Sequence, residues 1–120
     1  MNPRLRRAFH QTRYEAAGQV VRIGAHHDLA LPSLAAFITA WNPFSRRMPP
    51  GWNARMQQRL RAVAPAILAE GWGRGRGWAE QHLLAAGDPR RIAVLARRFR
   101  QHAIVLVAPR RPARLLILRR

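Results

Sequence analysis

Polar side chains mark the ends of several predicted elements and could together form a ligand site. They are Asn42, Ser45, Asn53, Glu80 and Gln101. If parallel crossovers join the strands, these residues meet at one edge of the sheet, where open α/β sheets bind ligands. The amides would then hold a polar ligand, with Glu80 as hydrogen-bond acceptor or base. Structural roles are the alternative, because Asn42 suits a turn, Asn53 suits a helix N-cap, and a buried Glu80 could pair with an arginine.

Glu80 is the candidate catalytic residue, because His82 lies two positions further along the same predicted strand. Side chains at i and i+2 share one face of a strand, so Glu80 could orient the imidazole as an acid–base pair. Ser45 has no identifiable base that would activate it as a nucleophile. The sequence therefore leaves open whether the chain is an enzyme. It contains no cysteine and its histidines are scattered, so we expect no metal site and no cofactor.

The charge of the chain is strongly one-sided. Its 22 basic residues, all arginine, face 5 acidic residues, and the net charge is +17. No acidic residue follows Asp88. A field of this kind attracts polyanions. The arginines predicted to contact a polyanion are Arg74, Arg76, Arg90, Arg97, Arg98, Arg110, Arg111 and Arg114.

A glycine-rich loop is predicted between Trp72 and Trp78. In such a loop the two tryptophans could stack on unpaired bases beside Arg74 and Arg76. The alternative is a mobile loop whose tryptophans cap the core, next to a solvated charged face. The excess of arginine and alanine also suggests a GC-rich genome, which weakens a functional interpretation of the arginines.

The apolar pattern predicts a single α+β domain over residues 14–120, preceded by a basic arm or short helix over residues 1–13. The order ββαβαββ predicts a small mixed sheet of about five strands with two main helices packed on it. The connections through the helices are expected to be right-handed parallel crossovers, with the last strand antiparallel at an edge. The predicted strands are residues 20–23, 35–41, 78–85, 103–107 and 115–118, and the helices begin near Asn53 and Pro89.

Three short motifs carry a resemblance to a known family. The first is the run from Phe37 to Pro43, with Asn53 at the start of a helix further on. The second is Glu80-Gln81-His82, and the third is Phe99-Arg100-Gln101 before an apolar strand. Through these motifs residues 14–107 resemble the bacterial domain-of-unknown-function family DUF3293.

The chain departs from the family pattern at two motifs. The family has Glu-Pro-Ser where this chain has Glu80-Gln81-His82, and it has a glycine where this chain has Arg100. The resemblance implies a bacterial source but no assigned activity, cofactor or partner. Strong basicity is not a mark of the family, so the polar residues match the family pattern and the charge does not.

Three classes of function remain. The charge favours a non-enzymatic binding module for an anionic partner such as nucleic acid. The alternative is a small-ligand-binding domain or enzyme that uses a polar pocket around Asn42, Asn53, Glu80 and Gln101. The third is an interaction subunit that pairs through an exposed edge strand at residues 115–118, and the oligomeric state stays open. The longest apolar run is too short to span a membrane, so we expect a cytoplasmic protein with no membrane partner.

Overall fold

The computed structural model describes residues 1–119 and shows an α+β fold with three α-helices and one seven-stranded sheet. The α+β class is confirmed, but the sheet has more strands than the sequence predicted. The helices are α1 (Pro3–Gln11), α2 (Pro50–Val63) and α3 (Pro89–Arg98), with a short 3-10 turn η1 (Pro43–Ser45). The strands are β1 (Arg13–Ala16), β2 (Gln19–Val21), β3 (Ala35–Ile38), β4 (Ile67–Gly75), β5 (Trp78–Ala86), β6 (Ala103–Val107) and β7 (Arg114–Ile117). No helix among residues 1–119 has the length and apolar character needed to cross a membrane.

Two strands that the sequence pattern did not predict, β1 and β4, change how the sheet is connected. The strand order is β2-β1-β4-β5-β3-β6-β7, and every neighbouring pair is antiparallel. The prediction of parallel neighbours is therefore wrong. Helix α2 leads from β3 to β4, and α3 leads from β5 to β6. In each case the two joined strands run in the same direction but a third strand lies between them, as in split βαβ units.

The segment predicted as a glycine-rich loop between Trp72 and Trp78 is the tip of a β-hairpin. Strand β4 extends to Gly75, and β5 begins at Trp78 after a two-residue turn in which Gly77 has a φ of 75°. Glycine adopts this left-handed conformation without steric cost, which makes it a favoured residue in tight hairpin turns. The prediction of a loop is wrong because the glycines alternate along a strand.

The alternation of glycine along β4 leaves space for side chains of neighbouring strands. A β carbon at Gly73 would lie 2.9 Å from Cε1 of His82, and one at Gly71 would lie 3.3 Å from the ring of Phe37. Glycine in a strand interior often marks such a close approach. These two positions therefore let Phe37 and His82 pack against β4.

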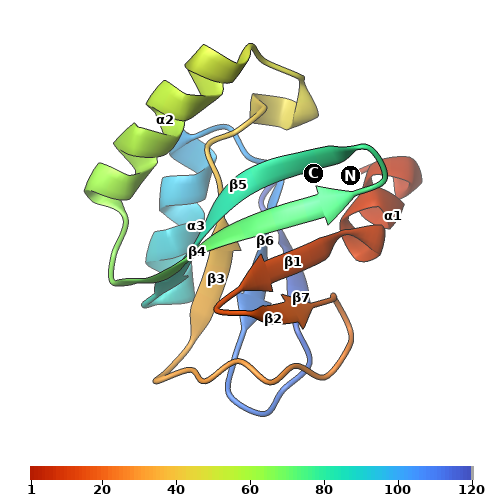
Figure 1. Cartoon of the computed structure of the whole chain (residues 1–120), viewed down its shortest axis with the longest axis vertical. Helices are drawn as coiled ribbons and strands as arrows, with labels where there is room; N and C mark the ends of the chain where they lie inside the picture. The colour runs from red at the N-terminus through yellow and green to blue at the C-terminus, as the bar shows by residue number, and fades with distance from the viewer. Residues whose placement is uncertain (120) are drawn as a thin grey trace.

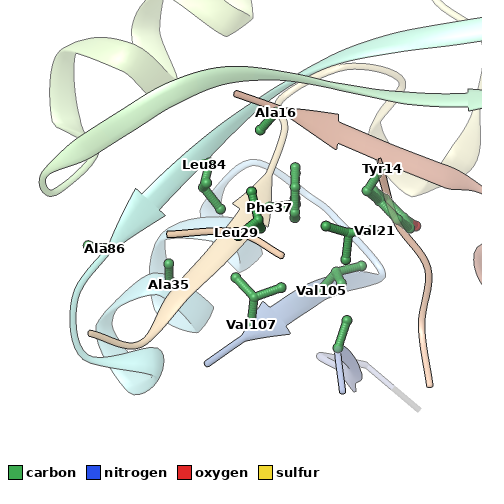
Figure 2. Packing of buried hydrophobic residues seen from close by; sticks show 11 residues of the cluster. Tyr14, Ala16, Val21, Leu29, Ala35, Phe37, Leu84, Ala86, Val105 and Val107 are labelled. Atoms are coloured by element: carbon green, nitrogen blue, oxygen red, sulfur yellow. The ribbon is translucent and has the colours of Figure 1, made fainter. Parts of the chain in front are cut away.

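The curled sheet buries one hydrophobic core on each face. Helices α2 and α3 cover one face (Figure 1). In the core of that face, Ile38 and Leu60 are fully buried. The other core lies inside the curl and contains Tyr14, Phe37 and Val105, whose side chains point toward a common interior (Figure 2). The inner core is thus built by β1, β3 and β6 together with their neighbours in the sheet.

The two edges of the sheet approach each other at one end of the curl. Ile23, just after β2, forms a parallel bridge with Ala113, just before β7. The Gly24 N–H also donates to the carbonyl oxygen of Ala113 at 2.8 Å. Because β2 and β7 stand at opposite ends of the strand order, this bridge nearly closes the sheet on itself.

Helix α1 lies apart from α2 and α3, beside the tip of the β4–β5 hairpin (Figure 1). Its start is well defined, because the side chain of Asn2 accepts a hydrogen bond from the Leu5 N–H at 2.8 Å and Pro3 occupies the first turn. Phe9 packs against the inner core. The basic N-terminal segment is therefore a helix that contacts the inner face of the sheet.

Candidate functional site

A cavity of about 570 Å³ lies between α1, the inner face of the sheet and the segment that leads into α2. Its apolar wall includes Phe9 from α1, Phe37 from β3 and Val105 from β6. Its polar side chains are Thr12, Tyr14, Thr39, Asn42, Ser45, Arg47, Asn53, Glu80, His82, Gln101 and His102. All five residues predicted to form a polar site line this cavity. They meet here although the adjacent parallel strands from which their meeting was inferred do not exist.

Asn42 is the centre of a hydrogen-bond network that joins three segments of the chain. Its Nδ2 donates to Oε2 of Glu80 at 2.6 Å. Its Oδ1 accepts from Nδ2 of Asn53 at 3.0 Å and from the N–H of Met48 at 2.9 Å, and its own N–H donates to Oδ1 of Asn53 at 3.0 Å. The network therefore uses every polar atom of the Asn42 side chain to fix the position of the Glu80 carboxylate.

The network also bears on the structural roles that the sequence offered for Asn53, as a helix N-cap, and for Glu80, as a partner of an arginine. Asn53 is buried inside α2 and is not its N-cap, because the helix already begins at Pro50. Glu80 forms no ion pair with an arginine among residues 1–119, since its carboxylate is bonded to Asn42. Even a partly buried carboxylate without a cationic partner is costly unless hydrogen bonds hold it.

The backbone next to Asn42 adopts an unusual conformation. Asn42, Phe44 and Ser45 have φ values of 47°, 53° and 60°, and Arg100, whose carbonyl oxygen accepts from the Phe44 N–H at 2.7 Å, has a φ of 57°. Residues other than glycine rarely occupy this left-handed region, and such strain gathers at functional sites. Two of these residues, Asn42 and Ser45, line the cavity.

Glu80 and His82 share one face of β5, as predicted, but they do not form the predicted carboxylate–imidazole pair. The Nδ1 of His82 lies 3.0 Å from the backbone carbonyl oxygen of Glu80, while the carboxylate is bonded to Asn42. Burial lowers the pKa of His82 to about 4, so its imidazole is neutral at pH 7. Burial also raises the pKa of Glu80, although the hydrogen bond from Asn42 opposes this shift. The acid–base pair is therefore a wrong prediction, and Glu80 remains as a carboxyl group with a shifted pKa.

Gln101 links the segment that follows β3 to the C-terminal end of α3. Its Nε2 donates to the carbonyl oxygens of Trp41 at 3.1 Å and Phe99 at 3.2 Å. The side chain is buried at the point where β6 begins and the chain leaves β3. Through these two hydrogen bonds Gln101 stabilises the cavity wall, which it also lines.

The cavity also contains polar groups that the sequence did not reveal. Tyr14 of β1 is buried next to Thr12, and burial raises the pKa of its phenol. Trp41 lines the cavity, and its indole N–H is buried without an acceptor among residues 1–119. The sequence pattern did not reveal Tyr14 because its strand contains only four residues, too few for a clear alternation of apolar and polar side chains.

The predicted polyanion-binding arginines lie on several elements of the fold. Arg97 lies at the end of α3 and donates to the carbonyl oxygen of Leu118. Arg110 and Arg111 lie in the turn that joins β6 to β7, at the opposite end of that hairpin from Leu118. The remaining positions are Arg90 and Arg98 on α3, Arg114 on β7, Arg74 on β4 and Arg76 in the β4–β5 turn.

The tryptophans flanking the β4–β5 turn have different surroundings. The guanidinium of Arg74 lies 4.9 Å from the ring centre of Trp72 and donates to Glu15 at 2.9 Å. Trp72 also contacts Trp41 edge-to-face. Trp78 is 43% exposed at the hairpin tip. Trp78 is therefore the more accessible of the two rings for stacking.

Comparison with known proteins gives one match. Residues 38–104 match the sequence model of a family described as "Protein of unknown function (DUF3293)". The match extends from the end of β3 to the start of β6 and therefore includes all five predicted polar residues of the cavity. No curated protein and no solved structure matches the chain.

Proposed function

The chain belongs to the DUF3293 family, as its resemblance to that family predicted, and on this premise we propose that it binds a small organic molecule in the cavity between α1 and β5. The observation that carries the proposal is the Glu80 carboxylate, which Asn42 holds in the wall of a cavity that has both apolar and polar lining residues. The volume of about 570 Å³ lies in the range of small-molecule sites. Such sites combine an apolar wall with a few fixed polar groups.

The lining of the cavity indicates the chemistry of its ligand. Phe37 and Val105 offer an apolar surface, and Glu80 offers an acceptor for a hydroxyl or amine. The indole N–H of Trp41 is a buried donor, and a ligand oxygen that reached it would remove a cost of about 1–3 kcal/mol. The ligand is therefore a molecule with an apolar body and a polar, hydrogen-bond-donating group. If an acidic proton of the ligand faced Glu80, the raised pKa of that carboxyl would suit a general base.

The proposal is tested by a panel of small organic compounds and the shifts that they cause in the amide NMR spectrum. Compounds that shift residues of the cavity should bind at least about ten-fold more weakly to Glu80→Gln, because a hydrogen bond to a carboxylate is stronger than one to an amide. Glu70→Gln is the matched control, since Glu70 pairs with Arg61 outside the cavity. Equal affinity of both variants for the same compounds would contradict the role of Glu80.

A second candidate function is binding of an anionic partner such as nucleic acid. It is favoured by the net charge of +17 and by the fact that, of the predicted arginines, Arg74 alone forms an ion pair within residues 1–119. Fluorescence polarisation with labelled single-stranded and duplex nucleic acids checks it at about 50 to 300 mM salt, with heparin as competitor. One nucleic acid should remain bound above about 150 mM salt, and Arg98→Gln and Arg111→Gln should weaken it. If rising salt abolished the binding of all polyanions equally, the result would count against this function.

A further inference from the structure

A second hollow opens directly beside the cavity. Its lining includes Met1, Asn2 and Arg4 at the start of α1, together with Phe44 and Arg119. The two spaces share four lining residues, namely Leu5, Ala8, Ser45 and His102. One molecule of moderate size can therefore extend from the cavity into the hollow.

The two spaces differ in charge. Among the described residues, the cavity lining carries one acidic residue, Glu80, and one arginine, Arg47, whereas the lining of the hollow has no acidic residue. The hollow has instead two arginines, Arg4 and Arg119, and the imidazole of His102. Charged and hydrogen-bonding groups of this kind recognise carboxylates and phosphates.

Arg119 is held in place before any ligand arrives. Its guanidinium lies 5.0 Å from the ring centre of Phe44, its Nε donates to the carbonyl oxygen of Gln101 at 3.3 Å, and one Nη donates to that of Arg97. The other Nη makes no hydrogen bond within residues 1–119. A side chain fixed in this way loses little conformational entropy when an anion binds.

We propose that the molecule bound in the cavity also carries an anionic group, and that Arg4, Arg119 and His102 hold this group in the adjoining hollow. This inference rests on the proposed function and narrows it to amphipathic organic acids, with a carboxylate or a phosphate as the anion. The apolar body lies against Phe37 and Val105, and a hydrogen-bond donor between the two parts meets Glu80.

A matched pair of fluorescent probes tests the inference. Anilinonaphthalene sulfonate and N-phenylnaphthylamine have the same aromatic body and the same N–H, but only the first carries an anion. Arg4→Gln should lower the affinity for the sulfonate probe by about five-fold, as expected for a partly exposed ion pair, and leave the affinity for the neutral probe unchanged. His102→Gln provides a second substitution in the hollow. The control is Arg59→Gln, which removes the same charge from an exposed position of α2 outside both spaces.

The outcomes separate this inference from the proposed function. Ala8→Trp fills the space shared by the cavity and the hollow, and Ala62→Trp on an exposed position of α2 is its control. If neither probe is affected by Ala8→Trp, the cavity is not a binding site and both proposals fail. If Ala8→Trp weakens binding of both probes but Arg4→Gln and His102→Gln act no differently from Arg59→Gln, the anion site is wrong and the cavity remains. Naphthyl phosphate and naphthoate, compared in the same way, show which anion is preferred.

Discussion

Replacing Asn42 with alanine is expected to lower the free energy of unfolding by about 3 kcal/mol, because three partly buried hydrogen bonds disappear together. The side chain of Asn42 donates to Glu80 and accepts from Met48 and Asn53. Without it, the carboxylate of Glu80 loses the hydrogen bond that holds it in the cavity wall. Alanine also tolerates the φ of 47° less well than asparagine does. Urea denaturation of the purified protein measures the loss.

Asn42→Gly is the control that separates the backbone from the side chain. Glycine accepts the left-handed conformation, so this variant keeps the backbone unstrained while it removes the same hydrogen bonds. Its free energy of unfolding should be higher than that of Asn42→Ala but still clearly lower than that of the natural chain. A loss below about 1 kcal/mol in Asn42→Ala would mean that the network does not hold the cavity wall, since one ordinary hydrogen bond contributes that much.

Acidification should destabilise the protein through His82. Burial lowers the pKa of its imidazole to about 4 in the folded chain, whereas the unfolded chain takes up a proton near the ordinary value of about 6.5. Between these two pH values the unfolded state binds more protons, so the free energy of unfolding falls as the pH falls. The contribution of His82 amounts to about 3 kcal/mol once the pH has reached about 4.

The variant His82→Gln isolates this contribution. Thermal unfolding of both proteins from about pH 7 to about pH 4 should show a steeper decline for the natural chain. Glu80 acts in the opposite direction, because its raised pKa makes the folded state bind its proton more tightly and costs stability as the pH rises through that range. Since Glu80 is present in both proteins, the difference between them reports His82. His26→Gln, at an exposed position, is the control, and identical slopes for all three proteins would overturn the assignment.

Most of the candidate site could be predicted from the sequence. Asn42, Asn53 and Glu80 are polar residues at or near the boundaries of apolar segments, and such residues are exposed to solvent or assemble around a site. The sequence could not show their partners, because these depend on strands that are far apart in the chain. The bond between Asn42 and Glu80 joins residues 38 positions apart.

The sequence pattern did not predict strands β1 and β4, for different physical reasons. Strand β1 is short and begins directly after α1, so four residues offered too little alternation. In β4, Gly71, Gly73 and Gly75 occupy one face, and glycine is depleted in strands because it has no side chain to pack. The space that Gly71 and Gly73 leave for Phe37 and His82 is visible only when the neighbouring strands are in place. Without β4, each helix was expected to join neighbouring parallel strands, which gave the wrong topology.

The charge pattern predicted a basic surface, and the arginines of that prediction lie on several elements of the fold. Arg97 and Arg98 lie on α3, about two turns of helix after Arg90. Arg110 and Arg111 lie in the turn between β6 and β7, at the opposite end of that hairpin from the C-terminal end of β7. Positions in a sequence do not specify which end of a hairpin faces which end of a helix. By contrast, Arg119, which the predicted set did not include, lies beside the cavity because β7 ends there.

The most direct test of the central claim is a crystal structure of the protein soaked with small organic fragments. The account predicts that bound fragments lie in the cavity between α1 and β5, with a hydroxyl or amine within hydrogen-bond distance of the Glu80 carboxylate. Fragments that also carry a carboxylate or phosphate should place it toward Arg4 and Arg119. Fragments that bind elsewhere on the surface and leave the cavity empty would contradict the account.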